Sequence, residues 1–372
     1  MSGAIPLTSN LAVPDTTAEQ LTRIWENLLG VQPIEPDQNY FDLGGDSILA
    51  VQMFAQIDKV FQVKLPVATL FEAPTIGELT QIVSREAPKS HWSSLVTIQS
   101  KGSRPPFFCM HGAGGNVLIY RELSNRLGED QPFYGLQSQG LDGNSEPLTR
   151  IEDMAAAYVR EIRRAQHEGP YYLGGYCMGG TIAYEVAQQL RAQGQEVALL
   201  AMFDTLNWGK LPPLNLWMKI QMGIERIVFH ALNFLRSDLE GMKTFLDEKF
   251  RALRNRIPVW RGMLLAKFGG NGESAPSRSL VLGKIWAGND RASLDYVPKP
   301  YPGVVTDFRP LKQYSIYHRP DMKWENLAQG GEQIVQLTVY PAGMLVEPFV
   351  KSLADQLKKS IDAAAKAQLA KR

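Results

Sequence analysis

The chain of 372 residues is poor in several features that would assign it to a particular class of protein. Its two cysteines, Cys109 and Cys177, are too few for a disulfide framework, so a reducing cytoplasm is the expected compartment. The net charge of +1 gives no overall basis for binding nucleic acid. No apolar run reaches the roughly 18–20 residues of a membrane helix, and the N-terminus lacks the basic flank and apolar core of a signal peptide. We therefore expect a cytoplasmic protein that binds neither nucleic acid nor a membrane.

The charge that is present is unevenly distributed. Residues 15–88 contain eleven acidic and four basic residues, so the rest of the chain carries the compensating positive charge. An acidic first part tethered to a basic second part could favour docking between the two. Because exposed charge pairs contribute little, ordinary solvated surface explains the same pattern equally well.

The first part of the chain has the pattern of short helices. Apolar residues recur at helical spacing over residues 18–29, and Gly30 follows as a stop signal. Further helices are predicted over residues 48–61 and 66–72, and a last one opens at Thr75, whose spacing to Glu78 fits a capping box. Four short helices in about 75 residues predict a small four-helix bundle, which we assign to residues 15–86. Residues 87–94 are the expected linker.

From residue 95 onward, predicted strands alternate with predicted helices. The strands cover residues 95–99, 107–110, 171–174, 197–203, 303–308 and 334–340. The helices cover residues 150–166, 181–192 and 346–370, and Thr149 and Glu152 again have capping-box spacing. This alternation predicts an α/β domain over residues 95–372, with a mostly parallel sheet and helices on both faces. Residues 206–285 interrupt it with consecutive helical patterns, which predicts a helical lid inserted over the sheet.

A glycine-rich loop leads into the second predicted helix and ends at Ser47. The run LGGDSI at residues 43–48 allows a sharp turn that leaves the serine uncovered. A serine at a helix start is ordinarily an N-cap, and for GDS alone that interpretation would prevail. Within a unit of four short helices, however, residues 17–86 resemble the peptidyl carrier protein family. The resemblance implies that a phosphopantetheinyl transferase attaches 4′-phosphopantetheine to Ser47, and that this arm carries an acyl or peptidyl chain.

The run GYCMGG at residues 175–180 lies between a predicted strand and a predicted helix. It matches the G-x-nucleophile-x-G elbow of α/β-hydrolases, with Cys177 in place of serine. The elbow needs small residues because the turn is tight and the helix packs close to the sheet. The start of a helix also favours the thiolate form of a cysteine. A buried structural cysteine is the alternative, which we assign to Cys109, whereas Cys177 is the predicted nucleophile.

Two further segments supply the expected supports of this nucleophile. HGAGG at residues 111–115 follows an early apolar strand, where this fold places an oxyanion loop. Ala113 and Met178 are the expected donors of its two backbone N–H groups. Asp204 follows the strand at residues 197–203, 27 residues after Cys177, at the place of a triad acid. No metal site is expected.

Taken in order, FFCMHGAGG, LGGYCMGG, FDTLN, YPGVV and MLVEPFV make residues 95–372 resemble the C-terminal thioesterase domains of nonribosomal peptide and polyketide synthases. The resemblance implies an α/β-hydrolase fold in which the lid shapes an acyl pocket. It implies transfer of the acyl chain from the carrier arm to Cys177, then release by hydrolysis or macrocyclisation. Upstream synthetase modules would load the carrier, so we expect the chain to be part of a larger synthetase.

The resemblance fails at the catalytic histidine. The family has P-G-x-H-x-x-M-L-x-E-P, whereas residues 341–348 read PAGMLVEP, and no histidine follows His318. A segment missing from this sequence between Gly343 and Met344, natural loss of activity, and replacement by another histidine such as His111 or His318 are all open explanations. Because deacylation depends on a base more than acylation does, we predict a persistent acyl-thioester on Cys177.

Two other functions stay open beside the releasing enzyme. One is a carrier domain fused to a catalytically inactive domain that only binds the acyl chain, which the missing histidine favours. The other is the coupling of two acyl units. Neither the acyl substrate nor the choice between hydrolysis and cyclisation follows from the sequence.

Overall fold

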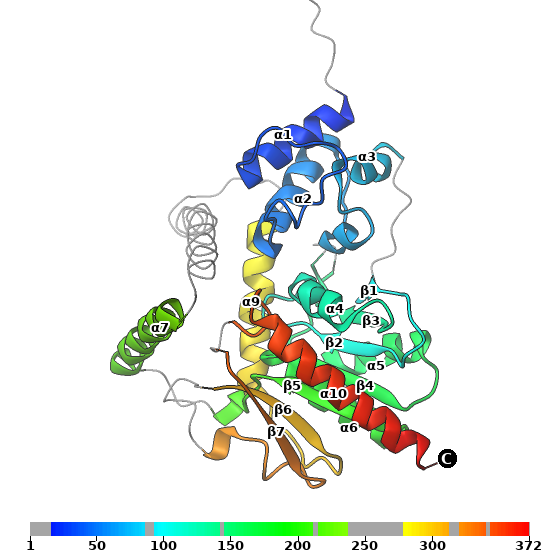
Figure 1. Cartoon of the computed structure of the whole chain (residues 1–372), viewed down its shortest axis with the longest axis vertical. Helices are drawn as coiled ribbons and strands as arrows, with labels where there is room; N and C mark the ends of the chain where they lie inside the picture. The colour runs from blue at the N-terminus through cyan, green and yellow to red at the C-terminus, as the bar shows by residue number, and fades with distance from the viewer. Residues whose placement is uncertain are drawn as a thin grey trace, which may run out of the picture. The chain divides into compact units, whose positions relative to one another are not determined.

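The computed structural model describes residues 16–85, 93–141, 145–210, 215–236, 278–311, 320–339 and 343–371. The chain divides into two compact units, Met1–Ser90 and His91–Arg372, which are described separately (Figure 1). Among the described residues, no helix is both long and apolar enough to cross a bilayer.

The first unit is a small helical bundle. It consists of α1 (Thr17–Leu29), α2 (Ser47–Phe61), the 3₁₀ helix η1 (Val67–Phe71) and α3 (Ile76–Ser84). The predicted helices are therefore confirmed, with the third one a 3₁₀ turn. Both α1 and α3 begin with a capping box, formed by Thr16 with Glu19 and by Thr75 with Glu78. The α1 helix packs against α2 and α3 around the fully buried Trp25.

The second unit is built on a seven-stranded sheet with the order β1-β3-β2-β4-β5-β6-β7. Only β1 (Leu95–Gln99) is antiparallel to its neighbour, β3 (Phe133–Leu136); all other pairs are parallel. The remaining strands are β2 (Phe107–Met110), β4 (Tyr171–Tyr176), β5 (Val197–Phe203), β6 (Val305–Pro310) and β7 (Glu332–Leu337). A mostly parallel sheet in this order, with β4 leading into a helix through Cys177, is the α/β-hydrolase arrangement.

Helices cover both faces of this sheet (Figure 1). On one face α5 (Ile151–Ala165) packs against α6 (Met178–Ala192), and on the other α4 (Arg121–Leu127) packs against α10 (Val350–Leu369). The main core lies between the sheet and the first pair of helices. Its fully buried members include Tyr158, Ile182, Val186, Leu173 and Met202.

Several boundaries differ from those predicted. The strand β3 and the preceding turn and helix, η2 (Leu118–Tyr120) and α4, had no counterpart in the prediction. The predicted capping box at Thr149 is wrong: Arg150 is the N-cap of α5, and no side chain caps it. Within the predicted lid the structure describes η3 (Trp208–Lys210), α7 (Leu216–Arg236) and α9 (Arg278–Asp295). The predicted lid ends at residue 285, but α9 continues through that residue to Asp295. The predicted end of the lid therefore falls inside a helix.

Candidate functional site

The first candidate site is the loop that precedes α2. Asp46 is the N-cap: its Oδ1 accepts a hydrogen bond from the Leu49 N–H at 2.8 Å, and its carbonyl accepts one from Ala50. Ser47 is therefore the first helical residue and does not cap the helix. Ser47 is half-buried.

A buried tyrosine fixes the shape of this loop from beneath. The Tyr40 hydroxyl donates a hydrogen bond to the Asp46 carbonyl at 3.0 Å, and the Tyr40 side chain is fully buried. A Cβ atom on Gly45 would lie 2.3 Å from the Tyr40 ring, so only glycine fits there. Tyr40 in turn packs edge-on against Trp25, with ring centroids 5.2 Å apart. The loop that presents Ser47 is thus tied to the core of the bundle.

The second candidate site is the turn between β4 and α6. Cys177 is the N-cap of α6 and has φ 57° and ψ −120°, a backbone conformation that is strained for a residue with a side chain. Its amide donates to the Phe203 carbonyl of β5 at 2.9 Å, which anchors the turn to the sheet. Cys177 is half-buried, whereas Cys109 lies fully buried in β2, as expected for a structural cysteine.

The glycines around Cys177 are required by close backbone contacts. A Cβ atom on Gly175 would lie 2.2 Å from the Gly179 backbone, and one on Gly179 would lie 2.3 Å from the Met110 carbonyl oxygen. One on Gly180 would lie 2.0 Å from the Thr205 hydroxyl oxygen. These contacts account for the small residues that the sequence places around the elbow.

The electrostatics of the Cys177 thiol differ from the prediction. Burial raises the pKa of the thiol to about 12; the Asp204 carboxylate adds to the shift, the hydrogen bond from the Met178 N–H opposes it, and Asp290 raises it further. The helix start favours the thiolate through the Met178 N–H, but burial and two neighbouring carboxylates outweigh it, so the net shift of the thiol pKa is upward. At neutral pH the thiol is protonated.

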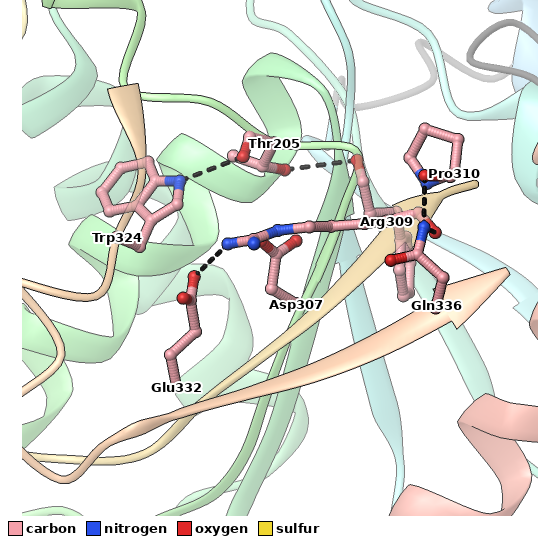
Figure 2. Close-up of polar contacts among 8 residues, drawn as sticks. Thr205, Asp307, Arg309, Pro310, Trp324, Glu332 and Gln336 are labelled. Carbon is pink, nitrogen blue, oxygen red and sulfur yellow. Dashed lines mark hydrogen bonds and ion pairs between the residues drawn. The ribbon is translucent and has the colours of Figure 1, made fainter. Parts of the chain in front are cut away.

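Asp204 follows β5 directly, at the place predicted for it, and its carboxylate influences the Cys177 thiol. Its backbone has φ 44°, and its amide donates to the Phe308 carbonyl of β6 at 2.9 Å. The next residue is also held, because the Trp324 indole N–H donates to the Thr205 carbonyl at 3.1 Å (Figure 2). The turn that carries Asp204 is thus held by one hydrogen bond to β6 and one from Trp324.

A buried charge cluster lies on β6 and β7 next to this turn (Figure 2). Arg309 bridges two carboxylates, with its Nε 2.5 Å from Asp307 and its Nη2 2.7 Å from Glu332. Burial raises the pKa of Asp307 to about 7, although the Arg309 guanidinium lowers it. Asp307 was not among the residues singled out from the sequence, because a lone Asp in an apolar strand carries no motif.

The oxyanion loop, residues 111–115, is held by hydrogen bonds to its carbonyls. The Gly112 carbonyl accepts from His111 Nδ1 at 2.7 Å and from the Gly115 N–H at 2.9 Å. Because a trans peptide points its C=O and N–H in opposite directions, these bonds turn the Ala113 N–H the other way. The Ala113 carbonyl in turn accepts a hydrogen bond from Asn289 Nδ2 of α9 at 2.9 Å.

His111 is a support of this loop and not a general base. It is fully buried, and its Nε2 lies 2.7 Å from the Tyr158 hydroxyl, so both ring nitrogens are engaged. Burial lowers the pKa of His111 to about 4, which keeps the ring neutral. Substitution of the missing base by His111 is therefore excluded by its geometry.

The segment that should carry the catalytic histidine is described from Gly343 onward. Met344 is fully buried, and Glu347 pairs with Arg126 of α4 at 2.7 Å. The other histidine whose side chain is described, His167, is exposed beside Glu168. His91 and His318, as well as the His230 side chain, lie outside the described residues.

Three residues near the site were missed by sequence reasoning. Asn289 binds the oxyanion loop, and its neighbour Asp290 influences the Cys177 thiol. Both belong to α9, whose second half was not predicted as a helix, and the dipeptide ND resembles a turn signal. The third is Tyr120, whose hydroxyl accepts a hydrogen bond from the Tyr176 N–H next to Cys177. It lies in a segment for which no helix or strand was predicted.

Comparison with known proteins agrees with this arrangement. Residues 19–83 match the family model of the phosphopantetheine attachment site, and residues 105–209 match that of the thioesterase domain. The dimodular nonribosomal peptide synthase of Bacillus subtilis is 38% identical over 192 residues, which are 51% of this chain and 8% of that protein. Malpinin synthetase of Mortierella alpina is 40% identical over 187 residues, which are 50% of this chain and 2% of that protein. The chain thus spans only a small part of the length of these relatives.

A solved structure shows the same fold. The crystal structure of a four-domain nonribosomal peptide synthetase bound to AMP and glycine aligns with 96% of this chain and 27% of its own, at 23% identity and a TM-score of 0.57. Fold and site define a carrier domain followed by an α/β-hydrolase-type thioesterase domain. The chain carries a phosphopantetheine attachment site and a thioesterase domain of the kind found in nonribosomal peptide synthetases.

Proposed function

We propose that the chain takes an acyl or peptidyl thioester from the carrier domain onto Cys177 and releases it slowly. The observation that carries the proposal is the strained turn at Cys177, where the half-buried sulfur accepts a hydrogen bond from the Met178 N–H. An amide at that position stabilises the oxyanion that forms when the sulfur attacks a carbonyl. Ala113 is the second donor in this proposal.

Ser47 is the proposed attachment residue for the phosphopantetheine arm. The residues fit the group because Asp46 caps α2, which leaves the Ser47 hydroxyl free of a structural task. When attached, the arm supplies the thioester that serves as substrate. In this proposal a phosphopantetheinyl transferase and upstream synthetase modules are the partners that modify and load the carrier.

The proposed turnover is slow because the site has an acid and a nucleophile without an identified base. A thiol with a pKa of about 12 is almost wholly protonated at pH 7, so acylation proceeds through a very small thiolate fraction. Deacylation requires a base that activates water or an internal nucleophile, and Asp204 alone offers a carboxylate without the histidine it would orient. An acyl-thioester on Cys177 is therefore expected to persist.

The experiment is intact-mass measurement of the full chain after Ser47 has been loaded with an acyl-pantetheine. A lasting adduct that peptide mapping places on Cys177, and that is absent in Cys177→Ala, supports the proposal. Rapid turnover without a trapped adduct would contradict it.

A catalytically inactive acyl-binding domain is the second candidate, favoured by the raised pKa of the thiol. Insertion of a histidine-bearing segment between Gly343 and Met344 separates the two functions. Restored release by this variant supports an impaired enzyme, whereas binding of the acyl chain without adduct or release, before and after insertion, supports a binding domain. The lid assigned to residues 206–285 is proposed to shape the acyl pocket in both cases.

A further inference from the structure

The strands that carry the two halves of the site, β2 and β4, are neighbours that separate at their carboxyl ends. Their parallel register runs from Phe107 opposite Tyr172 to Met110 opposite Gly175. Beyond this point β2 continues into the oxyanion loop, and β4 continues through Tyr176 to Cys177. The distance between these continuations decides whether a carbonyl fits between the sulfur and the Ala113 N–H.

The sides to which the backbone N–H and C=O groups point show which hydrogen bond between β2 and β4 comes last. In β2, the Phe107 and His111 amides bond to the β3 side, through the Pro132 and Leu136 carbonyls, so the Met110 carbonyl faces β4. In β4, the Cys177 amide bonds to the β5 side, so the Tyr176 amide faces β2. In a regular parallel ladder the Tyr176 N–H would therefore donate directly to the Met110 carbonyl.

A tyrosine hydroxyl bonds to both groups of this rung. The Tyr176 N–H donates to the Tyr120 hydroxyl oxygen at 3.0 Å, and that hydroxyl donates to the Met110 carbonyl at 2.5 Å. Two hydrogen bonds through the hydroxyl oxygen thus link the two backbone groups that a regular rung joins directly. The hydroxyl oxygen is a hydrogen-bond partner of both buried backbone groups.

The tyrosine is well placed to act as a fixed spacer. Its side chain is fully buried, its ring packs against Phe133 with centroids 6.2 Å apart, and its backbone N–H donates to the carbonyl of Val117, the N-cap of η2. Burial raises the pKa of the Tyr120 hydroxyl well above its ordinary value, so the hydroxyl keeps the proton that it donates. The Met110 carbonyl it fixes also borders the first turn of α6, at Gly179.

We propose that Tyr120 is a positioning residue whose hydroxyl, inserted between Met110 and Tyr176, sets the gap between the oxyanion loop and the Cys177 sulfur. The inference rests on the proposed function, because the gap matters only if a carbonyl enters it. Loss of the hydroxyl either lets the strand ends close into a direct rung or leaves two buried backbone groups unpaired. Either change displaces the Ala113 N–H relative to the sulfur.

The test compares Tyr120→Phe with a matched substitution elsewhere in the same unit. Tyr184 is also fully buried, and its hydroxyl also binds backbone, donating to the Lys299 carbonyl at 2.8 Å. Two reactions at Cys177 are measured on the full chain. Acylation by an N-acetylcysteamine thioester needs the oxyanion donors, whereas alkylation by iodoacetamide forms no oxyanion and needs only the thiolate.

Tyr120→Phe is expected to slow acylation by about 100-fold, the effect of misplacing an oxyanion donor, and to change alkylation less than about threefold. Tyr184→Phe is expected to leave both rates within about twofold. The inference would be overturned if Tyr120→Phe slowed acylation and alkylation equally. It would also be overturned if Tyr184→Phe slowed acylation strongly and alkylation little. If the unsubstituted chain is alkylated but never acylated, the proposed function fails, and the inference with it.

A second variant serves if Tyr120→Phe does not fold. Phe133→Leu keeps the hydroxyl and removes the aromatic ring that packs against the tyrosine. We expect acylation to fall by about tenfold while alkylation is unchanged, because the spacer loses its rigid support. Unchanged acylation in a folded Phe133→Leu chain would count against the inference.

Discussion

The two candidate sites are both helix starts with glycines close by in the sequence, yet they are built in opposite ways. At Ser47 the preceding Asp46 caps α2, and the serine has ordinary helical placement as the first residue. At the second site, the proposed nucleophile Cys177 is itself the N-cap of α6 and has the strained backbone. The first arrangement leaves the capping of α2 to Asp46, which suits the proposed modification of Ser47.

The second arrangement uses the fold to aim the reactive atom. The Cys177 amide bonds to β5, and the backbone of the turn lies close to β2 and to the first turn of α6. The contacts at Gly175 and Gly179 are too close for a side chain at either position. The cost is chemical, since the same surroundings raise the pKa of the thiol. A helix start therefore does not by itself activate a nucleophile; burial and neighbouring charge decide the outcome.

The largest expected effect separates the two sites completely. Ser47→Ala is predicted to abolish attachment of phosphopantetheine by a transferase, because the hydroxyl that forms the ester is gone. Cys177→Ala is predicted to be modified to the same extent as the unsubstituted chain. Intact mass after incubation with coenzyme A and a transferase measures both, and residual attachment to Ser47→Ala would remove Ser47 from the account.

The second effect concerns the charge buried on β6 and β7, next to the turn that carries Asp204. Because the pKa of Asp307 is raised to about 7, the folded chain keeps a proton between about pH 4 and pH 7 that the unfolded chain releases. Raising the pH across this window therefore favours unfolding, by on the order of 4 kcal/mol if Asp307 acts alone. Asp307→Asn should weaken this pH dependence of the unfolding midpoint. An unchanged dependence in the variant would show that other groups cause it.

The third effect tests the backbone contacts of the elbow. Gly179→Ala places a Cβ atom against the backbone of Met110 and is expected to lower the free energy of unfolding by about 1–3 kcal/mol. Gly283→Ala in α9 is the control, because its Cβ atom would meet nothing within 4 Å and should be neutral or stabilise by up to about 1 kcal/mol. Urea unfolding measures both. Equal stability of the two variants would contradict the packing described for the elbow.

The smallest effect concerns the exposed carboxylate of α9. Asp290→Asn removes one of the two charges that raise the pKa of the Cys177 thiol. Because exposed charges act weakly, alkylation of Cys177 at pH 7 should accelerate by at most about fivefold. Iodoacetamide kinetics followed by mass spectrometry measure it, and a slower reaction would mean that Asp290 assists the thiolate.

Much of the fold and part of the site could be predicted from local sequence signals. Thr75 and Glu78 form the predicted capping box, because nothing in the bundle competes with it. At Thr149 the same spacing fails, because α5 starts one residue later, at Ile151, which is fully buried. The spacing alone therefore does not fix the first residue of a helix, because such a cap contributes only about 1 kcal/mol.

What the sequence could not predict depends on contacts between distant segments. Tyr120 meets Tyr176 across 56 residues, and Asn289 meets Ala113 across 176 residues. Neither pair produces a sequence motif. Each is a single hydrogen bond from or to a backbone group, and such a bond fixes the residue type of only one partner. The raised pKa of Cys177 likewise depends on how Asp290 of α9 lies near the elbow.

The central claim is that a protonated, unassisted thiol at Cys177 accepts the acyl chain from the carrier. Its most direct test is the rate at which an acyl group moves from loaded Ser47 to Cys177 between pH 7 and pH 9, located by peptide mapping. With a thiol pKa of about 12, the rate should rise about tenfold per pH unit throughout this range. A rate that levels off near pH 7 would reveal a working base and contradict the account.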